Sequence, residues 1–583
     1  MPSHFDTPVR TGLALALSLS LACAPAADVE TEAEEAAVWS LGGTAPQAAS
    51  PRGAVSSGHP LASQVGADVL AAGGNAVDAA VAVGFALAAV LPTAGNIGGG
   101  GFLVYRSADG EVKTLDYRER APAASSRDMY LDESGEPTDK SVTGHLAAGV
   151  PGSVAGLAEM HRELGTMDWA SLVLPAAALA DGHEIDEYRH RSLEYARERL
   201  SQFETSKRIF LTEEGEALPI GTQWQQPELA RALRLIADDG PQAFYEGEIA
   251  DLLVAEMERG GGIITKQDLA EYAAVWREPI EADYRGYTIY SMPPPSSGGV
   301  TLALILNILE GYGQLPAFGS TELMHLQAEA MRRAFTDRNR YLGDPDFLEL
   351  PLERLQSQEY ADELRAQIDP ERASITEPYV EVTLESTQTT HYSIVDAEGN
   401  AASVTTTING SFGSAVAVEG AGFLLNNEMD DFAAAPGKPN QFGLVEGENN
   451  AIVPGKRMLS SMTPSVVLDP SGELYLVVGT PGGPTIITSV FHTISNVLDH
   501  GMSLTEAIES PRAHHQALPD AIFVEKAGFS EDTLEGLRSL GHETRVRGGV
   551  SGDVDAVIRV DDSWLAVADP RRGSGVAAVP AGG

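Results

Sequence analysis

Cysteine is almost absent from this chain, which has a single one, Cys23, among 583 residues. One cysteine excludes an internal disulfide framework and any metal site built from several thiolates. Basic residues are also few, since 39 Lys and Arg stand against 83 Asp and Glu, a net charge of 39 − 83 = −44. A surface this acidic repels phosphate backbones and anionic lipids, which argues against nucleic acid as a partner. It also suggests a protein that stays soluble in salty surroundings.

After the first two dozen residues, no segment of the sequence resembles a transmembrane helix. With 43% hydrophobic and 21% charged residues, the chain is able to bury a sizeable core. At roughly 150 residues per domain the length allows about four domains. One large domain or two intertwined domains fit the length equally well.

The N-terminus has the features of a secretory signal over residues 1–27. Arg10 precedes a short apolar run that ends at Cys23, and small residues follow up to Ala27. Two outcomes stay open, lipid attachment at Cys23 as in a bacterial lipoprotein and ordinary cleavage near Ala27. Residues 28–50, rich in Glu and Ala, are expected to form a disordered acidic linker. We therefore expect an exported protein of the bacterial periplasm or cell envelope.

The mature chain alternates apolar helical segments with strand-like segments. Residues 61–91 are apolar on nearly all sides and are interrupted only at 73–75, which predicts two buried helices joined by a turn. The stretch 150–370 is helix-rich, and the character changes near residue 389. Strands are expected at 102–105 and 112–117, hairpins at 392–396 with 401–408 and at 465–468 with 474–478, and a helix after Pro484. Strands between sets of helices predict a layered α/β protein.

Two patterns invite a ligand-binding interpretation that their details do not support. The glycine run 98–101 is not a dinucleotide loop, because Leu103 occupies the position of the third glycine in GxGxxG and no GK[ST] follows. We expect this run to allow close packing of a strand on a helix. His59, His514 and His515 lack the spacing of metal ligands, so we expect structural histidines and no metal site.

Thr389 opens the first strand of the second half, where a hydroxyl residue is ordinarily just a good strand former. Its surroundings, Gln-Thr-Thr-His-Tyr-Ser at 388–393, closely resemble the processing site of the gamma-glutamyltransferases, which are N-terminal-nucleophile hydrolases. Further segments resemble that family in the same order, from about residue 50 to 570. These segments are 73–79, 98–102, 115–122, 149–153, 424–432, 456–461 and 481–483.

The resemblance implies a four-layer αββα sandwich and a proenzyme that cuts itself between Gln388 and Thr389. The Thr389 hydroxyl would attack the Gln388 carbonyl, and water would open the resulting ester. The products would be a large chain, 51–388, and a small catalytic chain, 389–583, that stay intertwined as a heterodimer. The cut frees the α-amine of Thr389, whose unperturbed pKa of about 7.7–8.0 lets it take the hydroxyl proton near neutral pH.

The resemblance also assigns the other catalytic and binding groups. Thr407 would orient the nucleophile, and the backbone amides of Gly482 and Gly483 would stabilise the oxyanion. Arg118 would clamp the substrate α-carboxylate, because its planar fork matches two oxygens. The hydroxyls expected to help Arg118 are those of Ser460 and Ser461, and the groups expected to bind the α-ammonium are Asn409, Glu428 and Asp431. Phe442 falls at the gating aromatic of the family's lid loop, where Tyr is frequent, so any hydrogen bond from that hydroxyl is lost here.

The implied activity is that of a gamma-glutamyltransferase or glutathione hydrolase that needs no cofactor. It would cleave γ-glutamyl amides such as glutathione and pass the glutamyl group to water or to an amino-acid or peptide acceptor. Two alternatives stay open. One is an acylase for other amides, such as glutaryl-cephalosporin side chains or poly-γ-glutamate, which the presence of Arg118 and Asp431 disfavours. The other is a non-cleaving homologue used as an exported binding protein, which the presence of Thr389 and Thr407 disfavours.

Overall fold

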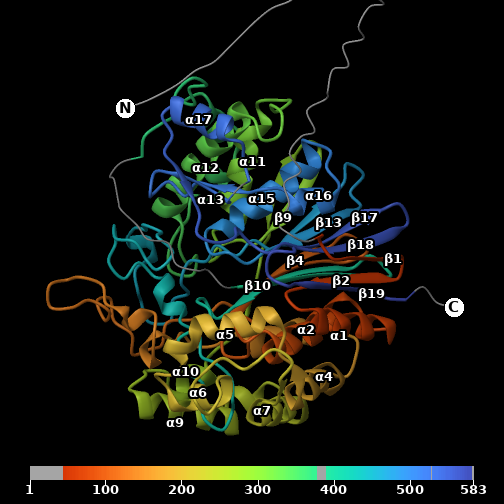
Figure 1. Ribbon diagram of the computed structural model, residues 1–583, viewed down its shortest axis with the longest axis vertical. Helices are drawn as coiled ribbons and strands as arrows, with labels where there is room; N and C mark the ends of the chain where they lie inside the picture. The colour runs from red at the N-terminus through yellow and green to blue at the C-terminus, as the bar shows by residue number, and fades with distance from the viewer. Residues whose placement is uncertain (1–43, 377–388, 527, 581–583) are drawn as a thin grey trace, which may run out of the picture. The chain divides into compact units, whose positions relative to one another are not determined.

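Two seven-stranded β-sheets lie face to face, and a layer of helices covers the outer face of each (Figure 1). The structure is a computed structural model that describes residues 44–376, 389–526 and 528–580. These residues all belong to one compact unit of the chain, Trp39–Gly583. The arrangement confirms the four-layer αββα sandwich.

Every pairing within the two large sheets is antiparallel. The first sheet has, in spatial order, β1 (Gln47–Ser50), β18 (Ser563–Ala568), β17 (Asp555–Val560), β13 (Leu474–Gly479), β12 (Ser465–Leu468), β9 (Tyr287–Ser291) and β8 (Ile280–Tyr284). The second has β19 (Gly575–Ala578), β2 (Gly53–Ser57), β10 (Thr390–Asp396), β11 (Ala401–Thr407), β3 (Gly100–Arg106), β4 (Val112–Asp116) and β7 (Val275–Arg277). Both expected hairpins, β10 with β11 and β12 with β13, are therefore present.

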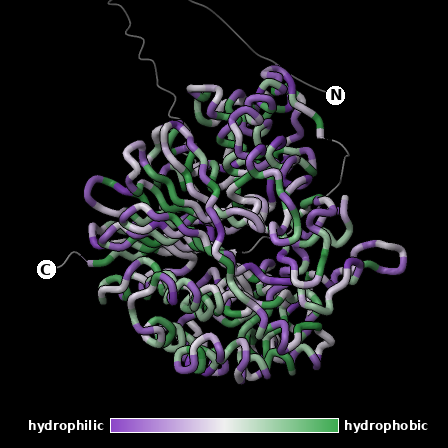
Figure 2. The backbone as a smooth tube through the Cα atoms, turned by 180° about the vertical axis from the view of Figure 1, so that it is seen from behind, coloured by the Kyte–Doolittle hydropathy of each residue, from purple (hydrophilic) through white to green (hydrophobic). Residues whose placement is uncertain are grey.

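The inner faces of the sheets form a core of their own. Phe102 and Val104 of β3 pack in the same cluster as Val466 of β12 and Val477 of β13. Residues two apart on a strand point to the same face, so each strand supplies this inner core with alternate side chains and the helix-facing core with the others. Figure 2 shows hydrophobic residues along the sheets and the helices that cover them, and hydrophilic residues in the outer loops.

The helices on the second sheet include the two expected between residues 61 and 91. All residues of α2 are buried, and Asn75 and Asp78 form a capping box at its start. In α1, by contrast, Leu61 and Gln64 are exposed, because its outer face meets solvent rather than protein. The helices of this layer are α1 (Pro60–Ala71), α2 (Ala76–Val90), α3 (Ser153–Leu164), α4 (Trp169–Asp181), α5 (Glu187–Leu200), α6 (Glu204–Phe210), α7 (Pro227–Asp239), α8 (Gln242–Tyr245), α9 (Glu248–Gly260) and α10 (Lys266–Ala270).

The other helical layer covers the first sheet and contains the helix expected after Pro484. Its members are α11 (Gly298–Glu310), α12 (Thr321–Tyr341), α13 (Leu352–Gln356), α14 (Gln358–Arg365), α15 (Thr485–Leu498), α16 (Leu504–Glu509) and α17 (Glu531–Ser539). Short strands complete the structure: β5 (His183–Glu184) with β6 (Gln223–Trp224), and β14 (Ala513–His514) with β15 (Ile522–Val524) and β16 (Thr544–Val546). Among the described helices, none has the length and hydrophobicity needed to cross a bilayer.

The expected linker differs from the structure at its C-terminal end. Residues Gln47–Ser50 are not a linker but strand β1, which pairs with β18 at the edge of the first sheet. The cause is tertiary, because the edge of β18 provides this segment with backbone hydrogen-bond partners that its own short sequence does not indicate. The expected signal at 1–27, Cys23, the linker up to residue 43 and Gln388 lie outside the described residues.

Candidate active site

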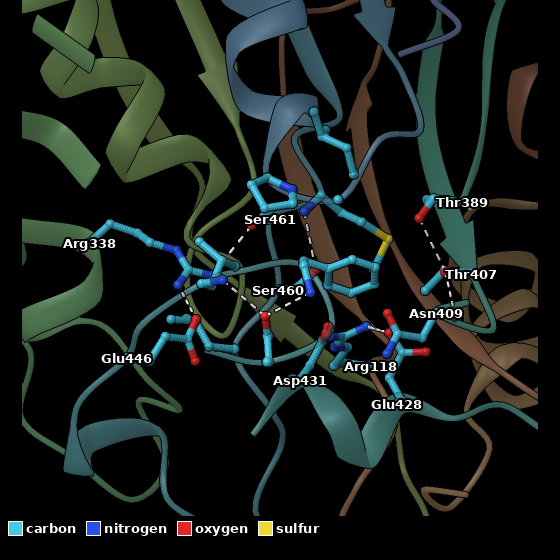
Figure 3. A pocket seen from close by; sticks show the side chains of 18 residues that line it. Arg118, Arg338, Thr389, Thr407, Asn409, Glu428, Asp431, Glu446, Ser460 and Ser461 are labelled. Carbon is cyan, nitrogen blue, oxygen red and sulfur yellow. Dashed lines mark hydrogen bonds and ion pairs between the residues drawn. The ribbon is translucent and has the colours of Figure 1, made fainter. Parts of the chain in front are cut away.

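One small pocket collects nearly all the site residues expected from the sequence (Figure 3). Its lining includes Thr389, Thr407, Gly483, Arg118, Asn409, Glu428, Asp431, Phe442, Ser460 and Ser461. Gly482 is not part of the lining. The cavity volume is about 20 Å³, which is room for about one water molecule. The pocket is thus assembled but nearly closed.

Thr389 and Thr407 meet where the β10–β11 hairpin approaches the pocket. Thr389 directly precedes β10, and Thr407 is the last residue of β11, so the antiparallel pairing brings their side chains together. The two hydroxyl oxygens are 3.3 Å apart. The backbone N–H of Asn409 donates to the Thr407 hydroxyl at 2.7 Å, which orients that group beside Thr389.

Asn409 has an unusual backbone conformation for a residue with a side chain. Its φ is +71°, in the left-handed region that Asn tolerates better than most residues. Its side-chain amide donates to the carbonyl oxygen of Asn427 at 3.0 Å. Within the described residues its side-chain oxygen accepts no hydrogen bond, so an acceptor is available at the pocket wall.

Gly482 and Gly483 lie immediately before α15, with φ of +144° and +57°. A Cβ at Gly482 would also lie 2.5 Å from the Thr485 hydroxyl, so both conformation and space require glycine. The carbonyls of the two glycines accept hydrogen bonds from the first turn of α15. In the described part of the chain neither backbone N–H donates a hydrogen bond, which leaves two donors near the positive end of the helix.

Arg118 enters the pocket two residues after β4 and is 1% exposed. Its guanidinium pairs with Glu428 and, at 2.5 Å, with Asp431. Burial lowers the pKa of Arg118, but the neighbouring carboxylates outweigh that effect and raise it above its usual value. Arg118 is therefore a cation at every relevant pH.

The acids around Arg118 outnumber it, because Glu119 lies 3.7 Å away as well. Burial raises the pKa of Glu119 to about 7 and that of Asp431 to about 6, against the pull of Arg118. The pKa of Glu428 is raised well above its usual range by the same burial. Both oxygens of Glu119 lack a hydrogen-bond partner among the described residues. Three buried carboxyls around one guanidinium do not all ionise, so part of this cluster holds protons at neutral pH.

Ser460 and Ser461 also line the pocket and use their hydroxyl oxygens as acceptors. The N–H of Met462 donates to Ser460 Oγ at 3.1 Å, and Arg338 Nη2 donates to Ser461 Oγ at 3.4 Å. Arg338, at the end of α12, also pairs with Glu446.

The segment 436–446 covers the pocket. A bridge between Pro439 and Val445 closes it into a loop, and Phe442 is 5% exposed. The carbonyl of Phe442 accepts a hydrogen bond from Gln516 at 3.3 Å. This loop and its buried ring account for the small volume of the cavity.

The family model described as gamma-glutamyltranspeptidase matches residues 62–579. The chain belongs to the gamma-glutamyltranspeptidase family. It is 47% identical over 527 residues to a glutathione hydrolase proenzyme of Escherichia coli (strain K12), covering 89% of this chain and 90% of that relative.

Two solved structures also resemble this gamma-glutamyltranspeptidase family member. A cephalosporin acylase from Bacillus halodurans has a TM-score of 0.81 at 28% identity, over 92% of this chain and 97% of that one. A Helicobacter pylori gamma-glutamyltranspeptidase has a TM-score of 0.53 at 45% identity, over 54% of this chain and 91% of that one.

The glycine run that this family member carries at 98–101 lies close to other backbone segments, as expected. A Cβ at Gly99 would lie 2.0 Å from the carbonyl oxygen of Thr407, and one at Gly98 would lie 2.1 Å from that of Leu424. The atoms nearest to these added Cβ atoms are thus backbone carbonyls. The expected helix contact is present as well, because the N–H of Ser153, the first residue of α3, donates to the Gly99 carbonyl at 2.9 Å.

The three histidines expected to be structural bond to protein groups. His59 accepts from the N–H of Leu61 at the start of α1. Among the hydrogen-bond partners of His514 and His515 are the Thr488 hydroxyl and the Asp520 carboxylate.

A different group in the described residues has the side-chain types of a metal site. His325, Glu329 and His542 bring ligand atoms within 4.8 Å of one another. The two rings are hydrogen-bonded to each other at 2.8 Å, and both oxygens of Glu329 are engaged by two arginines of α12 and by Ser374. With its carboxylate so occupied, the cluster ties the segment 373–376 to α12.

Sequence reasoning missed three residues of the pocket region, namely Glu119, Arg338 and Glu446. Glu119 adjoins Arg118 in a segment that resembles the family, so its position was a usable signal. Arg338 and Glu446 reach the pocket from a helix end and a loop, and nothing in their local sequence marks them.

Proposed function

We propose that this protein is an exported glutathione hydrolase that matures by self-cleavage before Thr389. Membership of the gamma-glutamyltranspeptidase family supports the activity, and the E. coli relative is a proenzyme by name. The observation that carries the proposal is a threonine pair, Thr389 and Thr407, in one pocket with Arg118 and buried carboxyls. That combination suits a nucleophile next to a site for a zwitterion.

Self-cleavage begins with attack of the Thr389 hydroxyl on the carbonyl carbon of residue 388. The C–N bond breaks, the acyl group moves to oxygen, and water hydrolyses the ester to give a carboxylate and a free α-amine. Each large sheet contains strands from both sides of this cut, such as β9 with β12 and β3 with β11. The large chain, 51–388, and the small chain, 389–583, therefore stay joined as a heterodimer.

Catalysis then uses the new amine as the base. It takes the Thr389 hydroxyl proton as the oxygen attacks the γ-carbonyl of the donor, and Thr407 orients the hydroxyl. The amides of Gly482 and Gly483 donate to the developing oxyanion. The amine of the donor leaves with the proton that the Thr389 amine had taken. Water or an amino-acid acceptor then releases the glutamyl group from its ester with Thr389.

Donor binding uses two sets of neighbouring groups in the pocket. Arg118, with the hydroxyls of Ser460 and Ser461, binds the α-carboxylate, while Asn409, Glu428 and Asp431 bind the α-ammonium. A cavity of about 20 Å³ does not hold a glutamyl group, so the lid segment 436–446 with Phe442 opens to admit it. Export of the protein rests on the signal-like residues 1–27, with cleavage near Ala27 or lipid attachment at Cys23 as its two forms.

An acylase for other amides is the second candidate, favoured by the similarity to the cephalosporin acylase. A glutaryl side chain has a carboxylate but no α-ammonium. Asp431, with a pKa of about 6, is an anion at neutral pH. With a glutaryl substrate bound, its charge would have no partner other than Arg118. The pocket acids therefore favour the amino-acid head group.

The deciding experiment combines intact mass spectrometry under denaturing conditions with an assay on L-γ-glutamyl-p-nitroanilide and glutaryl-p-nitroanilide. Two chains, the smaller starting at Thr389, and turnover of the glutamyl substrate are expected. One unbroken chain would remove the free amine and leave an exported binding protein as the better account. Preference for the glutaryl substrate would favour the acylase.

Thr389→Ala should leave a single uncut chain with no detectable turnover, because the same missing hydroxyl is needed for self-cleavage and for attack on the substrate. Denaturing gel electrophoresis and the same assay check this. A variant that still matured and turned over substrate would show that another residue is the nucleophile.

A further inference from the structure

Arg338 is a second arginine in the pocket, and the proposed function gives it no role. It lies at the C-terminal end of α12 and is 1% exposed. Figure 3 shows it on the side of the pocket away from Thr389, beside Ser461 and Glu446. Burying a guanidinium is costly unless its donors are used, so its contacts identify what it does there.

Each nitrogen of Arg338 has a partner. Nη2 donates to Ser461 Oγ at 3.4 Å, Nε donates to Ser297 Oγ at 3.2 Å, and Nη1 pairs with Glu446. The Ser297 hydroxyl in turn donates to the carbonyl of Ser460 at 2.6 Å. Arg338 therefore contacts the Ser461 side chain directly and the Ser460 backbone through the Ser297 hydroxyl.

These contacts determine which way the hydroxyl protons of Ser460 and Ser461 point. A hydroxyl has one proton to donate and two lone pairs that accept. Ser461 Oγ accepts from Arg338, and within the described residues its own proton goes to no protein acceptor. Ser460 is arranged alike, since its Oγ accepts from Met462. Both hydroxyls are thus left as donors, which is what a carboxylate, an acceptor-only group, requires.

Arg118 must share its terminal nitrogens between that carboxylate and protein acids. Both of its terminal nitrogens already bond to protein acids, Glu428 and Asp431. Additional donors with a set direction are therefore needed to favour a ligand carboxylate over the protein's own acids.

Glu446 connects Arg338 to the lid. It belongs to the segment 436–446, is 4% exposed, and accepts from Asn450 as well as from Arg338. The ion pair with Arg338 depends on the closed position of this segment, so lid closure and the placement of the guanidinium are linked.

We propose that Arg338 is a positioning residue for the donor α-carboxylate: it turns the Ser461 hydroxyl toward the substrate, and Glu446 holds it in that pose when the lid is closed. The inference rests on the proposed function. It makes recognition of the donor depend on a second arginine of the large chain that touches the substrate only through Ser461.

The test is a double-mutant comparison on the mature enzyme with L-γ-glutamyl-p-nitroanilide. Arg338→Met combined with Glu446→Gln removes both charges, so neither is left buried and unpaired. We expect KM to rise about tenfold, the effect of one charge-assisted hydrogen bond, with kcat within about twofold of wild type. In a Ser461→Ala background the same pair should change KM less than about twofold, because the effect passes through that hydroxyl.

Two further variants complete the design. Arg340→Met, on the exposed side of the same helix, is the matched control and should leave KM unchanged. Arg338→Lys keeps a cation for Glu446 but has a single nitrogen in place of the two that reach Glu446 and Ser461. It should raise KM about threefold or more, again only when Ser461 is present, and it serves if the double variant does not fold.

Equal KM ratios in the two Ser461 backgrounds, or an unchanged KM in all Arg338 variants, would overturn the inference. Wild-type turnover tests the proposed function separately, so its absence would count against the function and not against the role of Arg338.

Discussion

At the scale of single residues, the protonation of the acids around Arg118 decides how the pocket receives a zwitterion. Asp431, with a pKa of about 6, is ionised at neutral pH and keeps its charge opposite Arg118. Burial raises the pKa of Glu428 well above its usual range, against the pull of Arg118, so burial disfavours its charged form. Of these two proposed ammonium-binding acids, Asp431 is therefore expected to supply more of the negative charge.

Replacing the two acids by amides should therefore give unequal effects. Glu428→Gln replaces a carboxyl whose raised pKa disfavours the charged form by a neutral amide of the same shape, and it should alter the KM for γ-glutamyl-p-nitroanilide less than about threefold. Asp431→Asn removes a charge from the ammonium site and should raise KM about tenfold or more. Steady-state kinetics on both variants at pH 7.5 checks this, and a larger effect at Glu428 would reverse the assignment.

Donor affinity should also depend on pH through Asp431. The carboxyl ionises as pH rises through about 6, and the ionised form attracts the ammonium, so binding strengthens with rising pH. We expect KM to fall about tenfold between pH 5 and pH 7. In Asp431→Asn this fall should vanish. A persistent fall in that variant would assign the ionisation to another group.

Arg118 and Arg120 are neighbours in sequence with different environments. Arg118 lines the pocket. Arg120 does not line it, and its Nε donates to the carbonyl of Gly455 at 2.9 Å. Arg118→Ala should raise KM about 10- to 100-fold, the loss of charge-assisted hydrogen bonds, and Arg120→Ala should leave it nearly unchanged. Arg118→Lys keeps a cation beside the buried acids and serves if the alanine variant is unstable. Similar KM values for the two alanine variants would contradict the clamp.

At the scale of elements, the β10–β11 hairpin places the nucleophile, and the glycines before β3 make room for it. Thr407 pairs with Gly100 across β11 and β3. The adjacent Gly99 lies against the Thr407 carbonyl, and Asn96 accepts from the Gly99 N–H at 2.9 Å. Any side chain at Gly99 must move the strand that carries Thr407.

Gly99→Ala should therefore slow both maturation and turnover by at least about tenfold, since a Cβ 2.0 Å from a carbonyl oxygen forces a backbone shift. Gly548→Ala is the matched control, because a Cβ there meets nothing within 4 Å. The rate of appearance of the small chain, followed by mass spectrometry, is the measurement. Normal maturation of Gly99→Ala would mean that the strand tolerates displacement.

At the scale of the whole molecule, the net charge of −44 lowers the stability of the folded state. Like charges held on a compact surface repel each other more than in an expanded chain. At 1 M salt the Debye length is about 3 Å, so most of this repulsion is screened.

Raising NaCl from 10 mM to 1 M at pH 7 should accordingly raise Tm by a few degrees and leave activity intact. Differential scanning calorimetry and the p-nitroanilide assay on the same samples check this. A lower Tm or a collapse of activity in molar NaCl would show that exposed ion pairs stabilise the fold more than repulsion weakens it.

Local patterns were enough to predict several elements. The apolar run interrupted at 73–75 predicted α1 and α2, and two β-branched or apolar runs around a short turn predicted the β10–β11 hairpin next to Thr389. These follow from hydrogen bonds and periodicities that lie within a few residues. Strand β1 was missed, because its short sequence, Gln-Ala-Ala-Ser, forms a strand only where it pairs with the edge of β18.

The sequence by itself determined the family, the layered α/β class and the identity of the nucleophile candidate, since these depend on motifs and on local periodicity. Only the tertiary structure decided which distant groups share the pocket. Arg118 meets Glu428 across 310 positions of the chain, and Arg338 meets Ser461 across 123. The physical reason is that such contacts depend on sheet order and on how helix ends pack against loops, and no local pattern encodes either.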